Sequence, residues 1–97
     1  MKLTLTIVRD DDANKVVDAL TQHGFYVTRL ASTGGFLRTG NTVLLSGVED
    51  DQVDQMLQII QAHTQIHVHP PSSHLPREVQ VSRAVAFVLG LERLAKL

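Results

Sequence analysis

The alternation of apolar and polar residues predicts four main β-strands and one shorter strand in this chain. Successive side chains on a strand point to opposite faces, so a period of two residues indicates a half-buried strand. The segments with strand character are Lys2–Arg9, Phe25–Ser32, Asn41–Gly47, Glu78–Leu89 and, more briefly, Gln65–Val68. From Ala84 to Leu89 both faces are apolar, which is typical of a strand buried on both sides.

Two segments between these strands repeat apolar residues at the spacing of an amphipathic helix. The apolar stripes are Ala13, Val16, Val17 and Leu20 in the first segment and Val53, Met56, Leu57 and Ile60 in the second. Asp10 is the expected N-cap of the first helix, and Gly24 is expected to end it. Glu49–Asp51 supply the cap and the acidic first turn of the second helix, where negative charge is favoured.

The resulting element order, β-α-β-β-α-β, predicts an α+β fold of the ferredoxin-like type. Two split βαβ units of this kind form one antiparallel sheet with both helices on one face. The chain has 97 residues, which fits a single domain, 1–97, with a modest core. The proline-containing segment Pro70–Arg77 predicts a loop that is mobile without a ligand, and Gly90–Leu97 fits either one helical turn or an extended end.

Composition narrows the class of function. The formal net charge is −1 and the basic residues are scattered, which argues against nucleic acid as the main partner. The sequence has no cysteine, so disulfides and thiol catalysis are excluded and a cytoplasmic location is expected. The first apolar stretch is too short for a signal peptide, and no run of residues is long enough to span a membrane.

The stretch Ser32–Gly47 contains four glycines around a single aromatic residue, more than a hairpin turn requires. Thr33–Gly35 can turn successive N–H groups to one side and so favour an anion such as a phosphodiester. Phe36 offers a ring on which a base can stack, and Asn41 carries a donor and an acceptor that suit a purine edge. The remaining glycines, Gly40 and Gly47, suit turns or allow the backbone to approach a ligand closely.

The stretch Ser32–Gly47 also has a purely structural explanation, which needs no ligand. A Gly-Gly loop between strands is most often only a turn. Phe36 is then a core residue, and Asn41 is a turn residue that tolerates a left-handed conformation. Thr28 is explained by strand propensity and Phe87 by the core.

The histidines and the acidic residues predict neither a metal site nor catalysis. His67 and His69 would share one strand face, with His63 and His74 nearby, and imidazoles suit Zn, Cu or Ni. However, no carboxylate or cysteine lies among them and prolines interrupt the segment, so a solvated loop is the expectation. The acidic runs are explained by helix starts, and no nucleophile motif is present, so no enzymatic activity is predicted.

Three segments resemble the PII-like cyclic di-AMP receptor family of bacteria: LASTGGFLRTGNT (Leu30–Thr42), SGVEDDQVDQML (Ser46–Leu57) and AFVLGLERL (Ala86–Leu94). The resemblance covers most of the chain. It implies a ferredoxin-like homotrimer without enzymatic activity that binds cyclic di-AMP between subunits. The ligand contacts that it implies are Thr28, Gly35, Phe36, Leu37, Asn41, Gly47 and Phe87.

The resemblance also implies a signalling role, in which ligand contacts order the loops at Gly34 and Pro70 for a protein partner. Tyr26 stands where relatives often carry a basic residue, and the loop after the second helix is shorter than in relatives. These differences motivate a second hypothesis, a sensor of another adenine nucleotide. The histidine segment motivates a third, a metal-handling trimer of the same fold.

Overall fold

The computed structural model describes residues 1–30, 40–64, 67–69, 79–81 and 84–97. In chain order the elements are β1 (Lys2–Arg9), α1 (Asp10–Gln22), β2 (Thr28–Leu30), β3 (Asn41–Val48), the 3₁₀ turn η1 (Asp50–Gln52), α2 (Val53–Ala62), β4 (His67–His69), β5 (Val79–Val81) and β6 (Ala84–Gly90). The predicted bounds of the first strand are confirmed.

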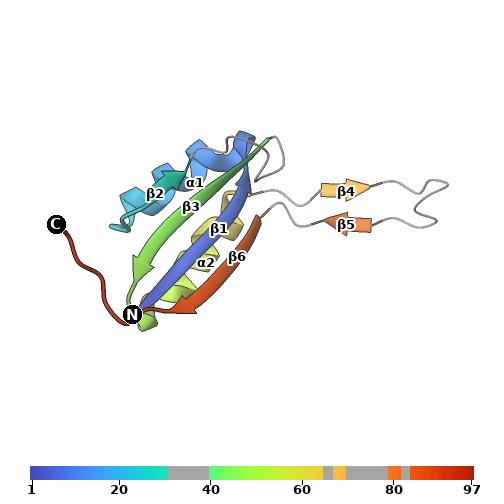
Figure 1. Ribbon diagram of the computed structural model, residues 1–97. Coiled ribbons are helices and arrows are strands. Elements are labelled where there is room, and N and C mark those ends of the chain that lie inside the picture. The colour runs from blue at the N-terminus through green and yellow to red at the C-terminus, as the bar shows by residue number, and fades with distance from the viewer. Residues whose placement is uncertain (31–39, 65–66, 70–78, 82–83) are drawn as a thin grey trace.

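A four-stranded antiparallel sheet with the order β2-β3-β1-β6 forms the body of the protein. Both α1 and α2 cover the same face of this sheet (Figure 1). The element order and the strand order are compatible with the predicted ferredoxin-like fold. A separate antiparallel pair, β4 with β5, makes a second, two-stranded sheet.

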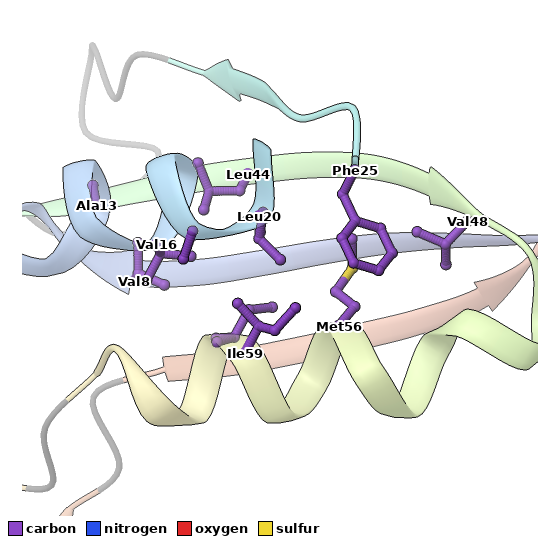
Figure 2. Packing of buried hydrophobic residues seen from close by; sticks show 11 residues of the cluster. Val8, Ala13, Val16, Leu20, Phe25, Leu44, Val48, Met56 and Ile59 are labelled. Atoms are coloured by element: carbon purple, nitrogen blue, oxygen red, sulfur yellow. The ribbon is translucent and has the colours of Figure 1, made fainter. Parts of the chain in front are cut away.

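The core lies between the sheet and the two helices, and Figure 2 shows its side chains meeting there. The buried apolar residues of this cluster are Val8, Ala13, Val16, Ala19, Leu20, Phe25, Leu44, Val48, Met56, Ile59 and Ile60. The stripe predicted for α1 is therefore correct, with Val17 packed at its margin. In α2 the structure adds Ile59 to the buried set, and Leu57 is only partly buried.

The beginning of α1 differs from the prediction by one residue. Arg9 is the N-cap, with extended backbone, and Asp10 is the first helical residue. The Asp10 N–H donates to the Gly40 carbonyl oxygen at 2.7 Å, and the Asp10 carboxylate accepts a hydrogen bond from the Thr42 hydroxyl at 2.5 Å. Asp10 therefore ties the helix start to β3 instead of capping the helix. At the other end, Gly24 ends the helix as predicted, with a φ of +85° that favours glycine.

The last predicted strand, Glu78–Leu89, is two strands in the structure. Val79–Val81 pairs with β4, and Ala84–Gly90 pairs with β1. The register explains the division, because Ala84 lies opposite Val8 and β1 ends one residue later at Arg9. In this register β5 lies beyond the end of β1, and it pairs with β4 instead.

The expected burial of Ala84–Leu89 on both faces is also wrong for the single chain. The strand β6 lies at the edge of the sheet, and all of its residues after Ala84 are exposed. Val85, Phe87 and Leu89 are 50%, 52% and 51% exposed. The second strand begins later than predicted, at Thr28, because Phe25 turns into the core. Its predicted end, Ser32, lies outside the described residues. Of the two alternatives for the tail, the extended end is observed over residues 91–97.

Candidate functional site

The two faces of the main sheet have different surroundings. In β1, the side chains of Thr4, Thr6 and Val8 lie on the helix-covered face and are buried. The alternate residues lie on the other face, which the helices leave uncovered (Figure 1). The pairing register assigns to this open face Leu3, Leu5, Ile7, Thr28, Leu30, Asn41, Val43, Leu45, Gly47, Val85, Phe87 and Leu89.

Every predicted ligand-binding residue that the structure describes lies on this open face. Thr28 is opposite Leu45 at one edge of the sheet, and Phe87 is opposite Leu5 at the other edge. Because Leu45 and Leu5 are themselves partners, Thr28 and Phe87 belong to one row that crosses all four strands. Asn41 and Gly47 lie near the two ends of β3. Gly35, Phe36 and Leu37 are outside the described residues.

The four residues share a face, but a single chain does not gather them into one pocket. Asn41 and Gly47 are six positions apart along β3, a span of about 20 Å. Thr28 and Phe87 are separated by three inter-strand spacings, roughly 14 Å. A compact ligand can therefore contact only part of this set on one chain.

A groove of about 550 Å³ lies at the end of the open face where β3 ends. It is lined by Met1, Tyr26, Gly47, Leu94, Ala95, Lys96 and Leu97. Tyr26 comes two residues before Thr28, and its carbonyl oxygen accepts a hydrogen bond of 2.5 Å from the Ser46 hydroxyl. This bond holds Tyr26 beside the end of β3. Gly47 and the tail residues line the groove together with Tyr26.

The tail residues of this groove were not predicted as part of a site. The Lys96 ammonium lies 5.6 Å from the centroid of the Tyr26 ring, within the range of a cation–π contact. The Leu94 side chain packs against Gly47. The alternation in Phe25–Ser32 places Tyr26 on the same side as Thr28, but no pattern in the sequence brings the tail to this position.

A second, smaller pocket of about 350 Å³ lies on the opposite, helix-covered side of β2 and β3, next to the start of α1. Its polar groups bond to one another. Arg29 donates to the side-chain oxygen of Asn14 at 2.9 Å, and Thr42 donates to Asp10. These bonds join the strands to the helix, so the pocket is explained by the fold.

The titratable groups add little chemistry to the site. Within the described residues, no three His, Cys, Asp or Glu side chains come together in a way that could hold a metal ion. His23 and His63 end the two helices, and in each the ring Nδ1 lies 2.8 Å from a carbonyl oxygen of the preceding turn. The hydrogen bond from the Met1 ammonium, followed by its charge, lowers the pKa of Asp50. No helix in the described part of the chain is long and apolar enough to cross a membrane.

The fold and the open face define a small α+β protein with a helix-covered core on one side of its sheet and a largely apolar face without helices on the other. The chain belongs to the cyclic-di-AMP receptor family, whose model matches residues 1–97. It is also similar to a solved structure, described as a functionally unknown protein from Pediococcus pentosaceus ATCC 25745. The identity is 33%, the TM-score is 0.75, and the match covers 99% of this chain and 96% of that one.

Proposed function

We propose that this chain is a non-enzymatic cytoplasmic receptor that binds cyclic di-AMP at the subunit interfaces of a homotrimer and relays the signal to a protein partner. The observation that carries the proposal is the position of Thr28, Asn41, Gly47 and Phe87, which share the open face but lie too far apart for one pocket. Residues from two subunits would complete a site that one chain leaves divided. Membership of the receptor family supports cyclic di-AMP as the ligand.

The exposed apolar surface supports an assembly of several chains. Large apolar side chains at Val85, Phe87 and Leu89 are about half exposed on the edge strand β6. Monomeric proteins rarely leave a contiguous apolar patch of this kind uncovered. Packing the open faces of neighbouring subunits together would bury this surface and bring the edge residue Phe87 toward another subunit's Thr28 or Gly47.

The roles proposed for the binding residues follow from their chemistry. The glycines before Phe36 would offer N–H groups to a phosphodiester, and the Phe36 ring would stack on a base. Asn41 would distinguish adenine by donating to and accepting from its edge. Ordering of the loops around Gly34 and Pro70 by these contacts would carry the signal to the partner.

Calorimetric titration tests the proposal, with cyclic di-AMP as the ligand and cyclic di-GMP, ATP, AMP and Zn²⁺ as comparisons. We expect saturable binding of cyclic di-AMP, with weaker or no binding of the guanine ligand. Light scattering after size exclusion should give the mass of three chains of 10.7 kDa. A protein that is monomeric and binds no adenine nucleotide would contradict the proposal.

A sensor of another adenine nucleotide is the second candidate, and the Tyr26 groove favours it. One chain alone supplies there an exposed ring, a cation and a glycine beside Thr28. A base and a phosphate of a mononucleotide would find complementary groups in a groove of about 550 Å³. Tighter binding of AMP or ATP than of cyclic di-AMP in the same titration would favour this candidate.

A further inference from the structure

The residue proposed to read the base, Asn41, lies at the very end of its strand. The pairing of β1 with β3 stops at the pair formed by Arg9 and Asn41. The preceding residue, Gly40, has a φ of +94° and lies outside the strand. Strand ends open more easily than strand centres unless other bonds hold them, so the position of Asn41 depends on what holds its neighbours.

One residue, Asp10, bonds to both neighbours of Asn41. The Asp10 backbone N–H donates to the Gly40 carbonyl oxygen at 2.7 Å. The Asp10 carboxylate accepts a hydrogen bond from the Thr42 hydroxyl at 2.5 Å, a distance typical of the strong hydrogen bonds made by charged groups. The first turn of α1 therefore fixes the backbone on each side of Asn41.

These bonds lie on the face of the sheet opposite to the proposed ligand contacts. Thr42 is paired with Val8, whose side chain is buried under the helices. Because successive strand residues point to opposite faces, the side chain of Asn41 lies on the open face. Asp10 thus holds Asn41 from behind the sheet and leaves the open face accessible to a ligand.

The same helix also holds the neighbouring strand β2. Arg29 donates to the side-chain oxygen of Asn14 at 2.9 Å, and Asn14 lies one helical turn after Asp10. Figure 1 shows α1 beside β2 and β3. The first two turns of α1 therefore bond to both strands that border the predicted phosphodiester and base contacts in the sequence.

We propose that Asp10 is a positioning residue of the nucleotide site, which holds Asn41 in the orientation that reads the adenine edge and does not itself contact the ligand. This inference rests on the proposed function and adds a residue to the same site. A hydrogen bond weakens steeply as its angle departs from linear, so the Asn41 amide recognises a base only while its backbone is fixed. The carboxylate of Asp10 would repel the phosphodiesters of the ligand, which fits a role on the opposite face.

Calorimetry with cyclic di-AMP separates the hydrogen bond of Asp10 from its charge. Asp10→Ala and Thr42→Val remove the same bond from its two sides. The apparent dissociation constant rises as the binding-competent fraction of the protein falls, so each variant should bind roughly three- to tenfold more weakly. Asp10→Asn keeps an oxygen that can accept from Thr42, so it should bind like the parent. Unchanged binding by Asp10→Ala and Thr42→Val would overturn the inference, as would Asp10→Asn binding as weakly as Asp10→Ala.

A control and a double-mutant cycle show whether Asp10 acts through Asn41. Asp18→Ala removes an exposed carboxylate about two turns farther along α1 and should leave the affinity unchanged. In an Asn41→Ala background, Asp10→Ala should change the affinity by less than about twofold, because the amide that it orients is already absent. A purely structural role of Asp10 would weaken binding by the same factor in both backgrounds, and equal factors would contradict the inference.

Nuclear magnetic relaxation of the ligand-free protein gives a readout that needs no nucleotide. The order parameter of the Asn41 backbone N–H should be near the value of about 0.85 of rigid backbone in the parent and in Asp18→Ala, and lower in Asp10→Ala and Thr42→Val. If Asn41 stays equally ordered in Asp10→Ala, the inference is wrong whether or not the parent binds cyclic di-AMP. If Asn41 loses order but the parent binds no cyclic di-AMP, the proposed function is wrong, and Asp10 only orders the end of a strand.

Discussion

The two faces of the main sheet are built from the same strands and have opposite properties. On the helix-covered face, Thr4, Thr6 and Val8 are at most 2% exposed. On the open face, the edge residues Val85, Phe87 and Leu89 are about half exposed, although they are larger and more apolar than the threonines. Residue type alone therefore does not explain burial here. What differs is whether a second layer covers the face.

This difference separates stability from function. The helix-covered face holds the core, and the buried Thr4 hydroxyl donates to the Ser46 carbonyl oxygen there. The open face holds every described residue for which a ligand contact is proposed, and also the apolar surface for which another subunit is proposed. Substitutions on the first face should act on folding, and those on the second face on assembly and binding.

The largest expected effect comes from one substitution made on each face. Leu20→Ala removes a core side chain that is 1% exposed and should cost about 2–5 kcal/mol of unfolding free energy at any protein concentration. Leu89→Ala makes the same change on the open face. The loss of unfolding free energy caused by Leu89→Ala should depend on protein concentration, because assembly contributes to the burial of Leu89. Urea denaturation at several concentrations measures both, and a concentration-independent loss of equal size at Leu89 would erase the distinction between the faces.

The next effect concerns assembly. Val85→Asp places a charge on the open face, two positions along β6 from Phe87, and an unpaired buried charge is costly. The mass from light scattering should fall from three chains to one, while circular dichroism stays unchanged. Gln58→Asp, on the exposed side of α2, is the control and should keep the parent mass. A Val85→Asp protein that remains trimeric would place the subunit contact elsewhere.

The contrast between the faces was partly predictable from the sequence. The period of two in Lys2–Arg9 gives the face of each residue in β1, and the stripe from Ala13 to Leu20 gives the helix side that covers one face. These are local patterns, which is why they were read correctly. The glycine at position 24 was likewise a local signal, since the helix end needs a positive φ.

The remaining features depend on partners that local patterns do not specify. The break before Ala84 follows from the point where β1 ends, which lies more than seventy residues earlier in the chain. The exposure of Phe87 follows from the edge position of β6 in the strand order. The contact of Leu94 with Gly47 joins two segments that carry no matching signal. Gly35, Phe36 and Leu37 remain predictions, because they lie outside the described residues.

Two substitutions sharpen the functional side of the comparison. Phe36→Ala should weaken nucleotide binding by roughly 1–3 kcal/mol, about tenfold to hundredfold, for adenine and guanine ligands alike. Asn41→Ala removes a directional amide, so it should weaken the adenine ligand more and narrow the gap between the two bases. Titration with both cyclic dinucleotides and one melt per variant measure this. A Phe36→Ala protein that melts far lower, with a loss of about 3–5 kcal/mol, would make Phe36 a core residue.

The smallest expected effect is a threonine-to-valine change made on each face. Thr4 is buried on the helix-covered side, where its hydroxyl donates to the Ser46 carbonyl oxygen at 3.2 Å and lies 3.3 Å from the Met56 sulfur. Thr4→Val keeps the shape and removes the hydrogen bond, so it should cost about 1 kcal/mol of unfolding free energy.

Thr28 is exposed on the open face, and valine has a strand propensity at least as high, so Thr28→Val should leave the unfolding free energy unchanged within about 0.5 kcal/mol. Its effect should appear in cyclic di-AMP binding instead, because the variant loses a hydroxyl that is proposed to contact the ligand. Denaturation and titration of both variants therefore give a crossed result, in which Thr4→Val changes only stability and Thr28→Val changes only affinity. If Thr28→Val binds cyclic di-AMP as tightly as the parent, the Thr28 hydroxyl is not a ligand contact and the site lies closer to the Asn41 end of the open face.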